Sequence, residues 1–309
     1  MTIHQVPAGG QLFHKSSTTD IVLAELEAAI RWLETCTGRS ASSTRFSAYL
    51  RVLREWKAGQ LKLSGDELLS VLNATSHAYE LIEIHQTLAK TELVGLAKKL
   101  RKYMTGPELE KDELSSSSSN LARNIGFELL LLARFCNCGL KVSLSSGADI
   151  VISREGIDVA IECKRPQTER KIEDSIKDAH RQLRLRRKGR KPGVVFIGMV
   201  ALSVGKLWHG ADKFVLTSDP AAFSEMCETA LSRLRALCEP PWHPLTHKKY
   251  SHLLLLNLRA FVLHDFEKLP VSGEETNLIE RDAYSGQTQR MLREFVSSTR
   301  GMLNWGNRR

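Results

Sequence analysis

The sequence predicts an α/β protein in which a helical N-terminal module precedes a domain with a central mixed sheet. Apolar residues recur at helical spacing through the first hundred residues, and no strand pattern is expected before residue 138. Beyond that point, short apolar runs with strand character alternate with helical segments. The 309 residues are 42% hydrophobic and 26% charged, which excludes wholesale disorder and fibrous proteins.

The N-terminal module is expected to span residues 1–112, and the second domain residues 113–309. Residues 1–19 read as a polar arm, and the five serines at 115–119 mark a break in composition near the boundary. The first helix shows Leu23, Leu26 and Ile30 at helical spacing. Four helices are predicted, at about residues 20–37, 43–57, 66–90 and 93–103.

The second domain opens with a strongly apolar helix at 120–138, which Gly139 should end. Three strand-like runs follow, with the sequences KVSLS, ADIVIS and IDVAIEC. The remaining elements are a basic helix (about 168–188), a buried strand (193–202), a helix (221–238), a proline-rich corner (240–244), an apolar strand (252–265) and a last helix (about 287–298). We expect the C-terminal third to extend the sheet and cover it.

The most informative segment is GADIVISREGIDVAIECKRP, residues 147–166. If Glu155 and Gly156 form a two-residue turn, the numbers of facing residues sum to 311, which places Asp149 opposite Glu162. Facing residues have Cβ atoms about 4.5–5.5 Å apart, a spacing that lets two carboxylates share one divalent cation. A three-residue turn would instead shift this register by one residue.

Strand alternation gives the predicted hairpin two different faces. The core face carries Ile150, Ile152, Ile157, Val159, Ile161 and Cys163. The other face, expected to lie toward water, carries Asp149, Val151, Ser153, Asp158, Ala160, Glu162 and Lys164. Two hard carboxylates beside a lysine suit Mg²⁺ or Mn²⁺ and phosphoryl chemistry. The competing interpretation is a surface hairpin with ordinary charges.

Asp149, twelve intervening residues and then Glu162-Cys163-Lys164 resemble the PD-(D/E)xK motif of restriction-endonuclease-like nucleases. The order helix, three strands, helix, strand is similar to the αβββαβ core of that superfamily. The resemblance covers about residues 120–202, and Gly147-Ala148 stands where the motif often has a proline. A restriction-endonuclease-like core with a central mixed sheet is the fold that it implies.

The resemblance also implies roles for individual residues. Asp149, Glu162 and the backbone carbonyl of Cys163 would hold Mg²⁺ or Mn²⁺, and Lys164 would assist the attacking water. Glu128, in RNIGFELLLLARF, matches an acidic residue of the first core helix that joins the metal site. Gln182, in AHRQLR, matches a polar residue on the helix after the motif. Structural pairing remains the alternative for Glu128, and an exposed helix position for Gln182.

Positive charge is concentrated just after this motif. The chain has a formal charge of +9, and residues 164–191 hold twelve Lys or Arg against four acids, a difference of +8. Such a segment suits contact with nucleic-acid phosphates, although a solvated helix face is the alternative. The residues predicted to contact nucleic acid are Arg165, Lys177, Arg181, Arg184, Arg186, Arg187, Lys188, Arg190 and Lys191.

We therefore expect a Mg²⁺-dependent phosphodiesterase, an endonuclease that prefers DNA to RNA, in DNA defence or processing. The alternative is a non-catalytic nucleic-acid-binding or scaffold protein that retains the nuclease fold. A homodimer, or a partner subunit bound through the helical module, also stays open. Scattered cysteines, the absence of a signal-peptide pattern and the absence of a run of about 18 apolar residues predict reduced thiols, a cytoplasmic location and no membrane contact.

Overall fold

The computed structural model of this chain is a mixed α/β structure whose strands form a single sheet. It describes residues 2–5, 19–61, 65–113, 120–145, 148–154, 156–188, 193–209, 213–216, 220–246, 253–263, 271–280 and 287–303. Within these ranges, no helix is both long enough and apolar enough to cross a membrane. All six cysteines are free thiols, as expected.

The N-terminal part consists of four helices, as predicted: α1 (Thr19–Thr37), α2 (Arg45–Lys57), α3 (Gly65–Leu88) and α4 (Leu96–Tyr103). Helix α3 is buried on nearly all sides because it packs against α1 and α2 and also against α5 (Leu121–Asn137). Helix α5 also packs against α4. Gly126 allows this approach, because a Cβ there would lie 2.6 Å from Glu80 Oε1 and 2.7 Å from the Tyr103 ring.

The sheet is mixed, with the strand order β1-β6-β7-β5-β4-β3-β2 and with β8 also paired to β7. Strands β4, β5 and β7 run parallel to one another, whereas β3 is antiparallel to β4 and β2 is antiparallel to β3. The strands are β1 (Thr2–Gln5), β2 (Val142–Ser145), β3 (Ala148–Arg154), β4 (Ile157–Lys164), β5 (Val195–Ser203), β6 (Lys213–Leu216), β7 (Leu253–Leu263) and β8 (Val271–Glu280).

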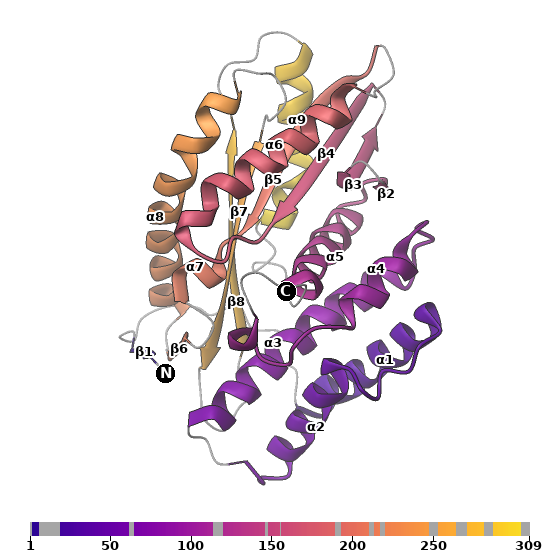
Figure 1. The fold of residues 1–309 in the computed structure, drawn as a ribbon, viewed down its shortest axis with the longest axis vertical. Coiled ribbons are helices and arrows are strands. Elements are labelled where there is room, and N and C mark those ends of the chain that lie inside the picture. Colours follow the sequence, from indigo (N-terminus) through magenta and orange to yellow (C-terminus); the bar gives the residue numbers. More distant parts are fainter. Residues whose placement is uncertain are drawn as a thin grey trace.

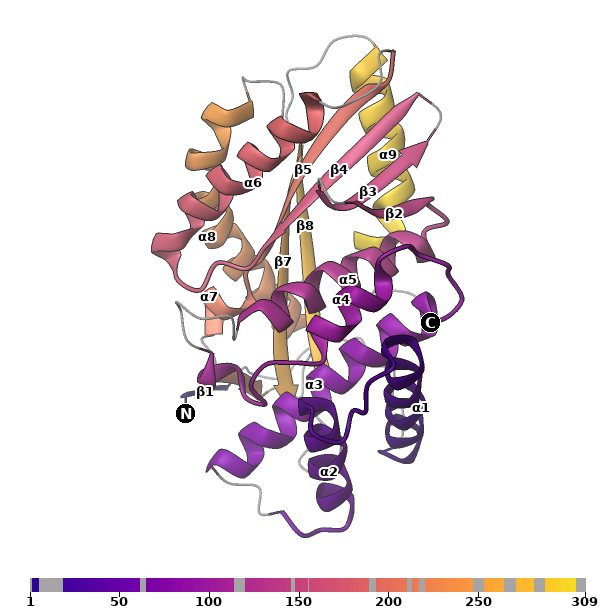
Figure 2. The same ribbon diagram turned by 45° about the vertical axis from the view of Figure 1, so that its right-hand side comes forward.

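Helices cover both faces of the sheet (Figures 1 and 2). One face packs against α6 (Ile172–Lys188) and α8 (Pro220–Thr246), through a core that includes Ile176, Leu183 and Leu234. The other face packs against α5 and α9 (Gln287–Leu303), and this second core continues into the N-terminal helices. Two short helical segments, η1 (Glu110–Asp112) and η3 (Glu169–Lys171), and the five-residue α7 (Gly205–His209) complete the described elements. The C-terminal third therefore extends and covers the sheet, as expected.

Two expectations about individual elements are wrong. A strand does precede residue 138, because β1 pairs in parallel with β6 at the edge of the sheet. Its four residues, TIHQ, are too few to show a strand pattern in the sequence. The proline-rich corner at 240–244 lies inside α8, which continues to Thr246. An interior proline costs a helix about 3 kcal/mol, and the complete burial of Trp242 against the sheet helps to offset that cost.

Candidate functional site

The β3–β4 hairpin has the predicted register. Ile150 faces Ile161 and Arg154 faces Ile157, so the paired residue numbers sum to 311. Gly156 in the connecting turn has φ of +71°, a left-handed conformation that glycine adopts without strain. Glu155 lies outside the described residues. Continuing this register by one pair brings Asp149 beside Glu162, at the end of the hairpin farthest from the turn.

Asp149 is anchored to the neighbouring strand by a hydrogen bond. Its Oδ2 accepts from the backbone N–H of Cys163, with a donor–acceptor distance of 2.8 Å. One carboxylate oxygen is thereby held against β4, next to Glu162. The Cys163 thiol itself is buried in the opposite core, and burial raises its pKa well above the ordinary value. This thiol is therefore protonated at neutral pH, as a core residue would be.

The face of the hairpin expected to lie toward water is largely covered, which corrects the prediction. Val151 and Ala160 are buried in the core beneath α6 and α8, and Glu162 is only 2% exposed. The cause is visible in α6, whose Ile172, Ile176, Ala179 and Leu183 form an apolar stripe against the sheet. The apolar face of the hairpin is buried as predicted, against α5.

Helix α6 brings Gln182 to the hairpin. Lys164 Nζ donates a hydrogen bond to Gln182 Oε1 at 2.5 Å, which positions the ammonium group at the end of β4. Gln182 is half-buried, not at the exposed helix position that was the alternative, and it contacts the lysine of the motif. Three of the predicted residues, Glu162, Lys164 and Gln182, thus lie on one side of the sheet.

Glu128 projects from α5 toward the same region and forms an ion pair with Lys99 of α4. Burial and the nearby Asp149 raise the pKa of Glu128, whereas Lys99 opposes that rise. Burial alone would lower the pKa of Lys99, but Glu128 raises it overall, and Asp149 adds to the effect. Sequence reasoning missed Lys99. The only signal for such a partner was that the Glu128 carboxylate, which lies among leucines in the sequence, needs a cation if it is buried.

The site carries excess negative charge. Burial raises the pKa of Glu162 from its ordinary value of 4.5 to about 8, and repulsion from Asp149 contributes next. Lys164 opposes this rise without cancelling it. Glu162 is a buried carboxylate with raised proton affinity beside a second carboxylate, and such a group is suited to binding a cation.

The cation ligands available here are two carboxylates rather than three. Throughout the described ranges, no three His, Cys, Asp or Glu side chains are placed to hold one metal ion together. In this conformation Glu128 is the partner of Lys99, while Asp149 and Glu162 form the central pair. A backbone carbonyl, as expected for Cys163, would have to supply a further ligand.

The basic residues predicted to contact nucleic acid separate into three groups. On α6, Lys177 and Arg181 have side chains 60% and 72% exposed, and each is paired with a nearby acid of the same helix. Arg184 and Lys188 are exposed, and Arg186 and Arg187 are half-buried. Arg190 and Lys191 lie outside the described residues. Arg165 contradicts the prediction of a surface contact, because its side chain is only 7% exposed and pairs with Glu110 and Glu113.

Comparison with known proteins gives no further guide to this site. No protein-family model, no curated protein and no solved structure matches the chain.

Proposed function

We propose that the chain is a metal-dependent nuclease of restriction-endonuclease-like fold that hydrolyses phosphodiester bonds, with DNA favoured over RNA. The observation that carries the proposal is the hairpin register, which brings Asp149 beside Glu162. The hydrogen bond from Lys164 to Gln182 adds an oriented cation next to this pair. The order α5-β2-β3-β4-α6-β5, with β4 parallel to β5, supports the αβββαβ core that the motif implies.

The residues present fit a divalent cation such as Mg²⁺ or Mn²⁺. Glu162 is buried, and this burial, followed by repulsion from Asp149, raises its pKa to about 8. A bound cation would favour its ionised form. Asp149, Glu162 and the Cys163 carbonyl would supply oxygen ligands of the kind that these ions prefer. When bound, the ion would polarise a phosphoryl oxygen and favour attack at phosphorus.

The protein's own groups would orient the reactants. Lys164, held by Gln182, would donate a hydrogen bond to the attacking water or to a phosphate oxygen. Asp149, held by the Cys163 N–H, keeps its second oxygen available on the same side. The exposed cations of α6 would contact the nucleic-acid backbone without reading its sequence.

The test is a cleavage assay with plasmid, linear and single-stranded DNA and with RNA, in Mg²⁺, Mn²⁺ or EDTA. Asp149→Asn and Lys164→Met should each reduce metal-dependent cleavage by at least about 100-fold. Asp158→Asn is the matched control, because this residue lies on the same strand face as Glu162 but at the far end of the hairpin, where it accepts a hydrogen bond from Ser153. Cleavage that survives both site substitutions would refute the assignment of these residues.

The alternative is a non-catalytic nucleic-acid-binding protein with the same fold. The ion pair between Lys99 and Glu128 favours it, because it satisfies Glu128 without a metal ion. Binding of nucleic acid without cleavage in any of the metal conditions would support this alternative and exclude the nuclease.

A further inference from the structure

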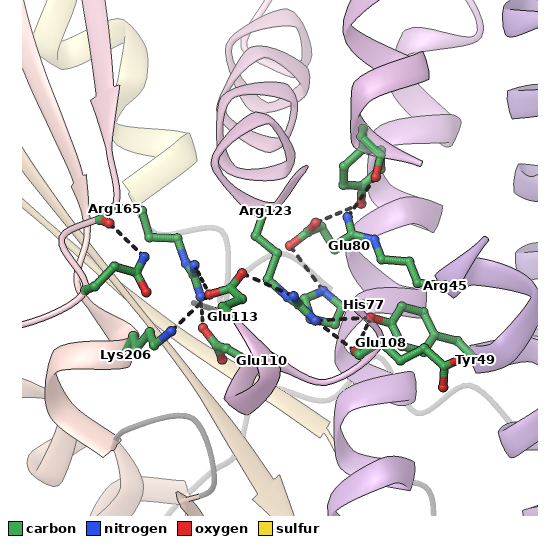
Figure 3. A network of polar contacts seen from close by, with 12 residues as sticks. Arg45, Tyr49, His77, Glu80, Glu108, Glu110, Glu113, Arg123, Arg165 and Lys206 are labelled. Carbon is green, nitrogen blue, oxygen red and sulfur yellow. Dashed lines mark hydrogen bonds and ion pairs between the residues drawn. The ribbon is translucent and has the colours of Figure 1, made fainter. Parts of the chain in front are cut away.

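A buried ionic network joins the N-terminal helices to the sheet (Figure 3). At its centre Glu113 has a fully buried side chain that receives three cations. Arg123 Nη1 lies 3.1 Å from Glu113 Oε1, while Arg165 Nη1 and Lys206 Nζ lie 2.7 and 3.0 Å from Oε2. Arg165 also pairs with Glu110. We refer to Glu110, Glu113, Arg123, Arg165 and Lys206 as the interface network.

The interface network borders a cavity of about 60 Å³. The cavity lies at one edge of the parallel strands: Arg165 directly follows β4, Ser203 ends β5, and Asn257 is the partner of Ser203 on β7. Helices α3 and α5 close it from the other side with His77 and Arg123, among other residues. Ligands of open α/β sheets bind beyond the carboxyl ends of parallel strands, which is where this cavity lies.

The surroundings of the cavity carry an excess of positive charge. Three cations of the interface network face the carboxylates of Glu110 and Glu113, an excess of one positive charge. Arg259, which also borders the cavity, pairs separately with Glu80. Burial lowers the pKa of Arg165 to about 10 and also lowers the pKa of Lys206. Buried cations in excess of their acidic partners are costly unless another anion balances them.

His77 adds a donor that has no acceptor within the described part of the chain. Its Nε2 accepts a hydrogen bond from Arg123 Nε at 3.2 Å, so the neutral ring carries its proton on Nδ1. Nδ1 is buried and makes no hydrogen bond to any residue that the structure describes, and its distance of 3.9 Å from Glu80 Oε2 is too long for one. Burial, followed by the positive charge of Arg123, lowers the pKa of His77 well below its ordinary value and keeps the ring neutral. The side chain is 9% exposed and lines the cavity.

We propose that this cavity binds a tetrahedral oxyanion: a phosphate ion or the phosphate of a monoester. Arg123, Arg165 and Lys206 would balance its charge, and His77 Nδ1 would donate a hydrogen bond to it. A volume of 60 Å³ accommodates about four to six water molecules, at about 10–15 Å³ each. This volume suits a single oxyanion and excludes a whole nucleotide.

The same chemistry has two sources, a free phosphate ion and the terminal phosphate of a nucleic-acid strand. Only the second source rests on the proposed nuclease function. Lys206 and Arg259 are the lining cations with the most exposed side chains, at 13% and 17%.

The test is a titration of the full chain with inorganic phosphate, followed by calorimetry and by thermal unfolding, with sodium chloride at matched ionic strength as the reference. Saturable heat and a saturable rise in Tm of several degrees are expected, because the ion binds the folded state alone. Lys206→Met should weaken binding at least about tenfold by removing one charge, and Lys206→Arg should restore it. Lys171→Met, at a side chain 65% exposed, is the matched control.

Ser203→Val narrows the cavity without removing a charge and should also weaken phosphate binding, which keeps the test decisive if Lys206→Met does not fold. Phosphate heats and Tm values indistinguishable from those in chloride would overturn the proposal. Equal affinities of the wild type and a folded Lys206→Met variant would do so as well. The Asp149→Asn variant should bind phosphate normally, so failure of the nuclease proposal and failure of this one are distinguishable.

The source is decided by comparing 5′-phosphorylated and 5′-hydroxyl oligonucleotides bound to the Asp149→Asn variant. Tighter binding of the phosphorylated strand, with competition by inorganic phosphate, supports a terminal phosphate as the ligand. Equal binding of both strands, in a chain that binds inorganic phosphate, supports the free ion.

Discussion

Glu162 is expected to make the protein less stable as the pH rises. Its carboxyl is buried beside Asp149, and its pKa in the folded chain is about 8, compared with an ordinary value of 4.5. Between these two values the folded chain keeps a proton on Glu162 that the unfolded chain has released. Stability therefore falls as the pH rises through this window, and the contribution of this carboxyl is fully present only below about pH 4.5.

Glu162→Gln removes this titration and keeps the size of the side chain. Each pH unit in the window corresponds to about 1.4 kcal/mol. From 4.5 to about 8 the total is therefore on the order of 5 kcal/mol. Relative to the wild type, the variant should gain stability progressively between pH 5 and pH 8, because glutamine has no proton to lose.

The measurement is the free energy of unfolding in urea at pH 5, 6, 7 and 8 for the wild type and for Glu162→Gln. A difference that grows with pH is expected. Asp158→Asn, on the same face of the hairpin, should show no comparable trend. Mg²⁺ or Mn²⁺ at pH 8 should stabilise the wild type, because a bound cation favours the ionised carboxylate. The difference in free energy of unfolding between the two proteins should therefore become smaller, and EDTA should restore it. A difference that stays constant from pH 5 to pH 8 would refute the assignment of an uncompensated buried carboxyl.

Three further predictions concern stability. Lys99→Met should destabilise the fold by about 1–3 kcal/mol in urea unfolding, because it leaves Glu128 without its cation; Lys98→Met, exposed on the same helix, should have little effect. Glu113→Gln should lower the free energy of unfolding by about 3–5 kcal/mol, because three cations lose a shared buried partner. Equal stability of Glu113→Gln and the exposed control Asp112→Asn would contradict this. Gly126→Ala should lower the Tm, because the added Cβ would collide with Glu80 and Tyr103. This collision should outweigh the helix preference of alanine over glycine, which is about 1 kcal/mol. An unchanged or higher Tm would show that these neighbours move aside.

Local patterns were sufficient to predict most elements and the hairpin that carries the candidate site. Helical spacing of apolar residues located α1 to α4, because these helices bury apolar side chains, while a strongly apolar run located α5 and a basic segment located α6. The register of β3 on β4 followed from the position of the turn, because the residue pair next to the turn fixes every later pair between the two strands. Short edge strands such as β1, and β8 with its mostly polar sequence, lack such a pattern and were not predicted.

Contacts between residues distant in the sequence were decided only by the tertiary structure. The partner of Glu128 is Lys99, 29 positions away on another helix, and no local pattern specifies that pairing. Arg165 looked like part of the basic segment because its neighbours in sequence are basic, yet folding buries it between Glu110 and Glu113. Sequence alone determined which residues share a strand face or a helix stripe, since those periods are properties of the local backbone. Which of these faces became buried, and which charges met there, depended on how α6 and α8 pack on one side of the sheet and how α5, α9 and the N-terminal helices pack on the other.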